Sequence, residues 1–337
     1  KTIFSEDKMR KITSGNMYRK QFNKKILGIA SLILLMLMSN AVAAPFAYIT
    51  HPWNNTVSVI DTAKDKVTST VDVGKYPWGV AVVPDGTKVY VTNSHGGGTV
   101  SVIDVAKNMV IKTININSGA NGVAVTPDGT KVYVVSPKSG LIYEINTKTN
   151  TIISTVKVGQ DSENIAASPD GSKVYVVRPY YNSTSVIDTA TNTVIATVNV
   201  GSLPFGIAIT SDGTKVYVAN SKDNTITVID TFTNNVIATI PVGKSPWGVA
   251  ISPDGTKLYV TNFMSNTVSV INAATNTVTA TIPVGEYPNG IAVTPDGSKA
   301  YVINTDGTFS IIDTATNKIK ANVEVGNKTF VFGKFIG

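Results

Sequence analysis

Few side chains in this 337-residue sequence could carry out chemistry. It contains two histidines, His51 and His95, and no cysteine. A tightly held metal ion needs three or more ligands at suitable spacing, and no third ligand stands at a fixed spacing from this pair. The glycines recur at turns, so there is neither a phosphate-binding loop nor a nucleophile elbow. We predict no catalytic residue, no metal site and no cofactor, with a single ion on the histidine pair as the alternative.

A second set of residues is suited to binding rather than to catalysis. Aromatic side chains and one arginine that gather on one surface describe a recognition site for protein or sugar. The predicted binding residues are Trp53, Tyr76, Trp78, Arg178, Tyr180, Tyr181, Phe205, Trp247, Phe263 and Tyr287. Whether they share a surface depends on the elements that carry them.

Those elements follow from an internal repeat. A tyrosine in runs such as Val-Tyr-Val-Thr-Asn recurs at Tyr48, Tyr90, Tyr133, Tyr175, Tyr217, Tyr259 and Tyr301, a step of 42 residues except for one step of 43. A period near forty with several short strands per unit is typical of a propeller. Each unit is a small sheet that must pack against its neighbours to bury its faces.

The unit from Trp247 to Gly285 contains four runs rich in Val, Ile, Thr and Tyr, separated by turn residues. We call these predicted antiparallel strands A to D. Strand A carries small residues at alternate positions, for example Gly248 and Ala250, which suits the crowded centre of a ring. We therefore place A innermost and D outermost. The predicted fold is all-β: a seven-bladed β-propeller with four antiparallel strands per blade.

The ends of the chain are predicted to complete one blade together. The chain enters the propeller with strands B, C and D, from about Phe46 to Gly74. Gly326 precedes Phe330 by four residues, as Gly74 precedes Trp78, so residues 330–336 occupy the strand A position. This C-terminal strand should pair near Tyr48 and close the first blade without leaving a free sheet edge. The propeller then spans residues 45–337.

The two faces of the predicted disc differ in sequence. The A–B and C–D loops form a repetitive face, with Pro-Asp-Gly turns and lysines such as Lys88, Lys173 and Lys257, whose substitution we expect to leave partner binding unchanged. The D–A and B–C loops form a variable face, which carries the aromatic residues and both histidines. Trp78, Phe205, Trp247 and Phe330 share one repeat position, so they either plug the channel mouth or bind a ligand.

The first 44 residues do not resemble the propeller. They carry eight basic residues against Glu6 and Asp7, then the apolar run Ile26–Met38 and the sequence Ala41-Val-Ala-Ala44. This pattern predicts a secretory signal peptide, with an uncleaved membrane anchor as the alternative. The remaining residues are nearly balanced, with 21 basic and 20 acidic side chains, so the high pI gives no argument for nucleic acid. We expect a secreted, cell-surface or periplasmic protein.

Several motifs support a family resemblance. Tyr90-Val-Thr-Asn93, Thr-Pro-Asp-Gly at 126–129 and Ile-Pro-Val-Gly at 240–243 recur in fixed order, and the chain resembles the YVTN family of β-propeller repeats. The likeness is greatest to exported and surface-layer-type proteins of archaea and to bacterial periplasmic relatives. It implies a seven-bladed ring without a well-defined enzymatic activity. We therefore expect a scaffold that binds a protein or a cell-envelope polymer.

The alternative is an extracellular or periplasmic enzyme of the lactonase or hydrolase kind. Propellers of that kind hold a divalent ion with Glu, Asn and Asp at the channel mouth. Asn121, Glu163 and Asn164 could approach such a place, whereas Asn289 stands well around the ring.

Three Asn-x-Ser/Thr sequons begin at Asn54, Asn182 and Asn327, all on the variable face. They are candidate glycosylation sites in an exported chain, although a sequence rich in Asn and Thr also contains such triplets by chance.

Overall fold

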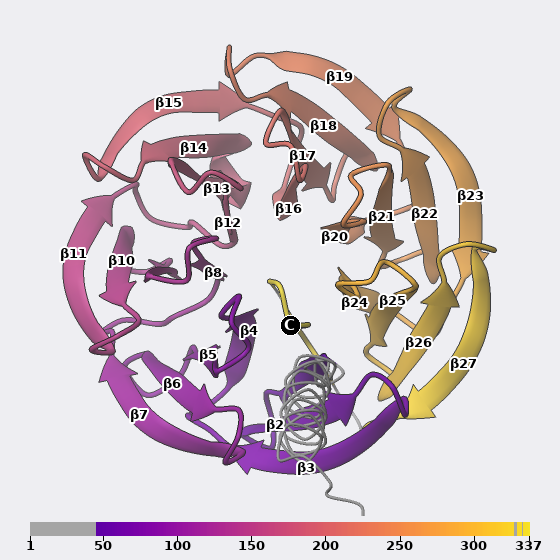
Figure 1. Cartoon of the computed structure of the whole chain (residues 1–337). Coiled ribbons are helices and arrows are strands. Elements are labelled where there is room, and N and C mark those ends of the chain that lie inside the picture. The colour runs from indigo at the N-terminus through magenta and orange to yellow at the C-terminus, as the bar shows by residue number, and fades with distance from the viewer. Residues whose placement is uncertain (1–44, 327–328, 332) are drawn as a thin grey trace, which may run out of the picture. The chain divides into compact units, whose positions relative to one another are not determined.

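The computed structural model describes residues 45–326, 329–331 and 333–337, which form a ring of seven small β-sheets (Figure 1). The predicted leader at residues 1–44 and the sequon at Asn327 lie outside the described residues. In the described part of the chain, no helix is long and apolar enough to cross a membrane. We number the sheets as blades I to VII in chain order.

The strands of each blade follow one another in the chain, with the following bounds. Blade I has β1 (Phe46–His51), β2 (Thr56–Asp61) and β3 (Lys66–Asp72). Blade II has β4 (Pro77–Val82), β5 (Lys88–Asn93), β6 (Thr99–Asp104) and β7 (Met109–Asn115). Blade III has β8 (Val123–Val125), β9 (Lys131–Ser136), β10 (Leu141–Asn146) and β11 (Thr151–Lys157). Blade IV has β12 (Ile165–Ala167), β13 (Lys173–Arg178), the 3-10 helix η1 (Pro179–Tyr181), β14 (Ser183–Asp188) and β15 (Thr193–Asn199). Blade V has β16 (Pro204–Ile209), β17 (Lys215–Asn220), β18 (Thr225–Asp230) and β19 (Val236–Pro241). Blade VI has β20 (Pro246–Ile251), β21 (Lys257–Asn262), β22 (Thr267–Asn272) and β23 (Thr277–Pro283). Blade VII has β24 (Pro288–Val293), β25 (Lys299–Asn304), β26 (Thr308–Asp313) and β27 (Lys318–Glu324).

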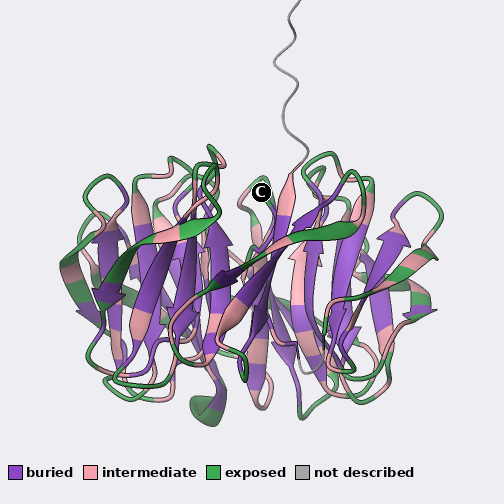
Figure 2. Cartoon of the chain, turned by 90° about the horizontal axis from the view of Figure 1, so that it is seen from below, coloured by how far each residue is buried: buried purple, intermediate pink, exposed green. Residues whose placement is uncertain are grey.

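The predicted strand order is confirmed. Neighbouring strands are antiparallel, β4 and its equivalents lie innermost, and β7 and its equivalents lie outermost (Figure 1). The inner three strands of each blade are mostly buried, whereas the outermost strand and the loops at both ends of the blades are largely exposed (Figure 2). The core lies between adjacent blades: Tyr217 and Val228 of blade V pack in one cluster with Val260 and Ile271 of blade VI. Burial between sheets is the main source of stability in such a ring.

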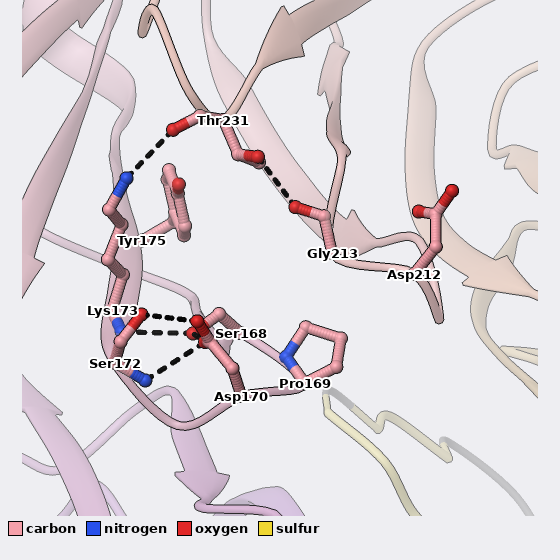
Figure 3. A pocket seen from close by; sticks show the side chains of 9 residues that line it. All are labelled: Ser168, Pro169, Asp170, Ser172, Lys173, Tyr175, Asp212, Gly213 and Thr231. Carbon is pink, nitrogen blue, oxygen red and sulfur yellow. Dashed lines mark hydrogen bonds between the residues drawn. The ribbon is translucent and has the colours of Figure 1, made fainter.

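The lysines of the repetitive face connect neighbouring blades. The Nζ of Lys88 donates to the carbonyl oxygen of Thr147 at 2.6 Å, and the Nζ of Lys173 donates to that of Thr231 at 2.8 Å (Figure 3). Lys257 makes the equivalent bond to Thr314 at 2.5 Å. Substituting these lysines should therefore cost stability, because each satisfies a carbonyl of the next blade, while their neutrality for partner binding stays a prediction.

The Pro-Asp-Gly turns are held by their aspartates. The Asp170 carboxylate accepts hydrogen bonds from the hydroxyls of Ser168 and Ser172, at 2.5 and 2.7 Å, and from the Ser172 backbone N–H (Figure 3). These bonds favour the ionised carboxylate and lower the pKa of Asp170 to about 2. Similar hydrogen bonds lower the pKa of Asp85, Asp128, Asp212, Asp254 and Asp296.

The repeated aspartates predict acid sensitivity. A carboxyl whose pKa is lower in the folded state stabilises the fold above its unfolded pKa of about 3.9 and loses that contribution as pH falls. We expect the melting temperature to drop between about pH 4 and pH 2. Asp170→Asn should be less stable than wild type at pH 7, and the difference should shrink at pH 2. Melting curves at both pH values test this, and an unchanged difference would contradict it.

The C-terminal residues 329–337, here called the tail, complete blade I as predicted. The Tyr48 N–H donates to the Phe335 carbonyl at 2.9 Å, and Ala47 and Ile336 form a β-bridge. On its other side the tail accepts a hydrogen bond from Val82 of β4. The tail therefore lies between β1 and β4 and covers both edges.

The register of the tail differs from that of the other inner strands. In blade II, Ala81 faces Tyr90 and stands seven residues after Gly74. By the same count, Gly333 stands seven residues after Gly326 and should face Tyr48. Instead, the Tyr48 N–H donates to the Phe335 carbonyl, so the tail is shifted by two residues. Gly333 has φ 90°, and a side chain there would meet the Val80 carbonyl at 2.5 Å. The turn at this glycine places Phe335 and Ile336 in the core, where both are fully buried.

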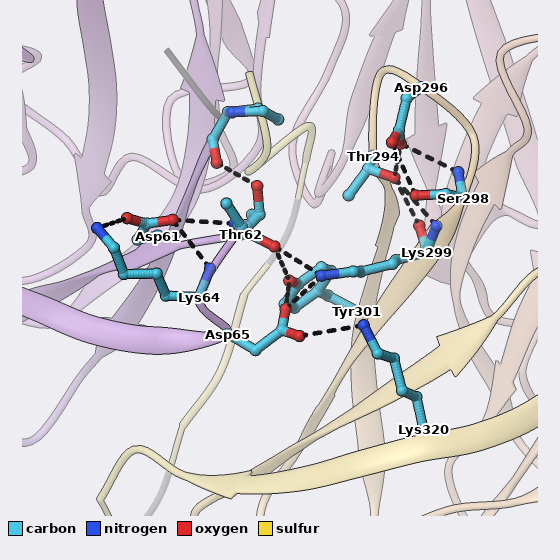
Figure 4. A network of polar contacts seen from close by, with 12 residues as sticks. Asp61, Thr62, Lys64, Asp65, Thr294, Asp296, Ser298, Lys299, Tyr301 and Lys320 are labelled. Carbon is cyan, nitrogen blue, oxygen red and sulfur yellow. Dashed lines mark hydrogen bonds and ion pairs between the residues drawn. The ribbon is translucent and has the colours of Figure 1, made fainter.

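Polar contacts also join the last blade to the first. Lys299 and Tyr301 of β25 donate to the Thr62 carbonyl and to the Asp65 carboxylate, both in the β2–β3 loop (Figure 4). Lys320 of β27 lies 3.6 Å from the same carboxylate. Because these residues come from opposite ends of the propeller sequence, the network holds the ring closed together with the tail.

Candidate binding site at the channel mouth

The loops of the variable face are tied to one another in pairs. The Tyr76 N–H in the β3–β4 loop donates to the Asn55 side chain in the β1–β2 loop at 2.9 Å. Ser245 bonds to Asn224 in the same way, at 2.8 Å. Asn55 and Tyr76 both have positive φ, which asparagine tolerates better than most residues. The D–A and B–C loops therefore share one face, as the sequence predicted.

Seven residues, one per blade, lie near the start of the inner strand at the channel mouth on this face; six share one repeat position, and Phe330 belongs to the tail. These mouth positions hold Phe330, Trp78, Asn121, Glu163, Phe205, Trp247 and Asn289, in the order of blades I to VII. The inner strands crowd closely here: a Cβ at Gly79 would lie 2.5 Å from the Asn121 carbonyl oxygen. A Cβ at Gly206 would lie 2.0 Å from the Trp247 carbonyl oxygen, so only glycine fits at these places.

The four aromatic mouth residues contact one another. Phe205 stacks on Trp247 with ring centroids 4.2 Å apart, and Trp78 stacks on Phe330 at 4.6 Å. Trp247 also meets Phe330 edge to face at 6.1 Å, although Asn289 stands between them in the order of blades. The rings therefore form a continuous row across blades II, I, VI and V. This is the arrangement expected of a plug at the channel mouth.

The row extends outward onto the exposed loops. Tyr76 contacts Trp53 at 5.5 Å, Trp78 at 5.9 Å and His95 at 4.7 Å. On the other side, Phe263 contacts Trp247 at 5.4 Å and Tyr287 at 5.2 Å. We call the connected rings the aromatic cluster; its members are Trp53, Tyr76, Trp78, His95, Phe205, Trp247, Phe263, Tyr287 and Phe330.

The predicted residues of blade IV lie apart from this cluster. The Arg178 guanidinium stands 4.1 Å from the centre of the Tyr181 ring, a cation–π contact within the blade. Tyr180 is 74% exposed on η1. No ring contact among the described residues joins them to the aromatic cluster. The predicted binding residues therefore fall into two groups that share no ring contact among the described residues.

The four candidates for a divalent ion separate as well. Asn289 is fully buried and holds the tail, since its amide donates to the Thr329 carbonyl at 3.0 Å and accepts from the Val331 N–H. Asn164 bonds to the backbone of its own neighbour. Only Asn121 and Glu163 meet: the amide donates to the Glu163 carboxylate at 2.6 Å. The described residues contain no group of three or more His, Cys, Asp or Glu side chains able to hold a metal ion.

Burial raises the pKa of the Glu163 carboxyl, and the negative charge of Asp161 adds to the effect. The hydrogen bond from Asn121 acts in the opposite direction but is outweighed. The Glu163 carboxyl group is thus partly removed from water at the channel mouth.

The expectation that both histidines are loop residues is wrong for His51. It ends β1, is 4% exposed, and its Nε2 lies 2.8 Å from the Ser58 hydroxyl, while burial lowers its pKa. Asn93 in blade II and Asn220 in blade V occupy the equivalent position and bond to Ser101 and Thr227. Aligning the repeats at this residue would have identified the structural role of His51. His95 is exposed beside Tyr76.

The sequons at Asn54 and Asn182 are exposed, but Asn182 already has a local structural role. It ends η1 in a left-handed conformation, and its side-chain oxygen accepts from the Leu203 N–H at 3.1 Å. Glycosylation at both asparagines stays a prediction.

A cavity of about 530 Å³ fills the channel on the repetitive side of the aromatic row. Strand A residues such as Val82, Ala124 and Ile251 line it, together with prolines of the A–B turns. Lys334 of the tail is the one charged residue among the described lining residues. The cavity was not predicted; apart from Lys334, the described lining side chains are apolar or neutral.

Comparisons with known proteins agree on the fold. A family model described as YNCE-like beta-propeller matches residues 131–254. No curated protein sequence matches the chain. A chain of hydrazine synthase from Kuenenia stuttgartiensis is similar in structure, with a TM-score of 0.72 and 22% identity, covering 83% of this chain and 92% of that one. A functionally unknown protein from Desulfotomaculum acetoxidans has a TM-score of 0.73 and 20% identity, covering 84% of this chain and 98% of its own. At such identities, the likeness supports a β-propeller and no particular function.

Proposed function

We propose that this chain is an exported, non-catalytic scaffold of the cell-surface or surface-layer kind, and that it binds a protein or cell-envelope polymer through the aromatic cluster. The observation that carries the proposal is the continuity of the cluster: its rings come from blades I, II, V, VI and VII and form one connected group. Contiguous exposed aromatics on a monomer surface are characteristic of interaction sites. The leader pattern and the YVTN-like motifs support export.

Closing the channel explains only the inner part of the cluster. Trp78, Phe205 and Trp247 are half-buried and pack at the mouth, as a plug requires. Trp53 and Tyr287, by contrast, are 54% and 45% exposed on loops. Leaving such rings in water costs hydrophobic free energy that a bound partner would recover.

The proposal predicts which substitutions weaken binding. Trp53→Ala, Phe263→Ala and Tyr287→Ala should each reduce affinity for the partner by about 1 kcal/mol or more, with little change in melting temperature. The partner is first isolated from an envelope extract with the purified propeller, and the variants are then compared by calorimetry.

Phe232→Ala is the matched control, because Phe232 is 93% exposed in the β18–β19 loop of the repetitive face. It should leave affinity unchanged. If Phe232→Ala abolished binding and the three cluster variants did not, the repetitive face would be the binding face.

The alternative function is an extracellular or periplasmic lactonase or hydrolase with a divalent ion at the mouth. The contact between Asn121 and Glu163 supports it, since amide and carboxylate oxygens suit hard cations. Calorimetry with Ca²⁺, Mg²⁺ and Zn²⁺, followed by structure determination, tests it. An ion held by three or more side chains would favour the enzyme.

A further inference from the structure

Glu163 is the one charged residue among the seven mouth positions. It carries no ion pair, since the pairs found among the described residues are Lys64–Asp61, Lys107–Asp104, Lys131–Glu144, Lys299–Asp65 and Lys320–Asp65. Its polar side-chain partner is the Asn121 amide at 2.6 Å. Asp161, two residues earlier, makes the local potential more negative. A carboxylate in such a place would be stabilised by a bound cation.

The rest of the mouth is an apolar wall. Phe205, Trp247, Phe330 and Trp78 form the row of contacting rings, and Asn121 and Glu163 occupy the two mouth positions between its ends. In the order of blades Glu163 is the neighbour of Phe205 and stands across the ring from Phe330, so we expect a group in the mouth to have rings on one side and this carboxylate on the other. Aromatic faces attract cations through their quadrupole, most strongly when water is displaced.

From this juxtaposition we infer that the channel mouth binds an alkylammonium group, with Glu163 as its counter-ion and the mouth rings as its apolar wall. The inference rests on the proposed function and names the chemistry of its ligand. An anion would be repelled by Asp161 and Glu163. A neutral sugar could stack on the rings but would leave the half-buried carboxylate without an opposite charge. The ammonium group belongs either to a free small amine or to a lysine side chain.

The first test compares two ligands of the same shape that differ in charge. Calorimetry and tryptophan fluorescence are measured with choline and with its neutral isostere 3,3-dimethylbutan-1-ol. Choline should bind at least tenfold more tightly, because only its cationic head can interact electrostatically with Glu163 and the rings. Equal binding, or binding of neither ligand nor of the lysine probe below, would overturn the inference. This comparison uses the unaltered protein and so does not depend on a variant that folds.

The second test removes the charge. Glu163→Gln keeps the size of the side chain and a hydrogen-bond acceptor for Asn121, and it should weaken choline binding at least tenfold. Glu286→Gln is the matched control on an exposed loop of the same face, and it should bind as wild type does. Phe205→Leu should also weaken binding. If Glu163→Gln bound choline as wild type does, the carboxylate would not be the counter-ion.

Nα-acetyl-lysine methylamide distinguishes the two sources of the ammonium group. Tighter binding of this probe than of choline indicates a lysine side chain of a macromolecule, and the reverse order indicates a free amine. Failure of the inference can be told from failure of the proposed function. If no ammonium probe binds but Trp53→Ala and Tyr287→Ala still weaken binding of the isolated partner, the proposed function stands and only the inferred ligand chemistry is wrong.

Discussion

Deleting residues 329–337 should lower the melting temperature of the propeller by roughly 12–24 °C, which is the largest effect that we expect from any small change. Val331, Phe335 and Ile336 of the tail are fully buried in the cluster that also holds Tyr48 and Val80. Burying each of these side chains stabilises the fold by about 2 kcal/mol, so their joint loss costs about 6 kcal/mol. A domain of this size loses about 2–4 °C per kcal/mol.

The deletion also removes the backbone contacts that close the ring. The N–H groups of Phe46 and Tyr48 would lose the Gly337 and Phe335 carbonyls, at 3.0 and 2.9 Å. Val82 of β4 would lose the Lys334 carbonyl on the other side. Two sheet edges would then face water, and such edges pair readily with other chains. The truncated protein should therefore also aggregate at concentrations where the full chain does not.

Melting curves and light scattering measure both effects. Lys334→Ala is the control, because its side chain is exposed and only its backbone pairs with β4. It should melt as wild type does. A truncated protein with the melting temperature of the full chain would contradict the assignment of the tail to blade I.

The fold could be predicted from sequence because the information repeats. Each tyrosine of the series beginning with Tyr48 and Tyr90 is buried at the same place between blades, and each Asp-Gly turn forms the same hydrogen bonds. The strand order followed from the alternation of small residues such as Gly248 and Ala250, and the close approach of inner strands confirms it. Averaging over seven copies makes such patterns far clearer than in a domain without repeats.

The site was predicted less completely, because contacts between residues at different repeat positions do not recur from blade to blade and so leave no pattern in the sequence. The edge contact of Trp247 with Phe330 depends on the width of the mouth, which the sequence does not give. The separation of Tyr180 from Trp53 likewise depends on the positions of the blades around the ring. The two-residue shift of the tail depends on the local turn at Gly333. The role of Lys173 became visible only from its partner, the Thr231 carbonyl in the next blade.

The ring-closing carboxylate Asp65 should show the second large effect. Asp65→Ala should cost about 3 kcal/mol, because it removes the carboxylate that Lys299 and Tyr301 share and leaves them only the Thr62 carbonyl. The Lys299 side chain is only 15% exposed and Tyr301 is fully buried, so water cannot readily replace the carboxylate. Asp65 also has φ 53°, a conformation that alanine adopts less easily.

The protein itself supplies the control for this substitution. Asn150 and Asn276 occupy the equivalent turn position and accept hydrogen bonds from Tyr90 and Tyr217 through the side-chain oxygen. Asp65→Asn should therefore keep the tyrosine bond and the turn but lose the charge, and cost only about 1 kcal/mol. If the alanine and asparagine variants unfolded at the same urea concentration, the hydrogen bond and the turn would contribute nothing beyond the charge.

The pH dependence of the same variants separates the charge from the turn. Burial acts to raise the pKa of Asp65, but hydrogen bonds from Lys299 and Tyr301 and the charges of Lys299 and Lys320 outweigh it, and the pKa is lowered. A lowered pKa means that this stabilisation is present above the unfolded value near 3.9 and is lost as pH falls below it. The difference in unfolding free energy between wild type and Asp65→Asn should therefore be largest at neutral pH and shrink in acid. The cost of Asp65→Ala relative to Asp65→Asn should stay constant with pH, because neither variant titrates at this position.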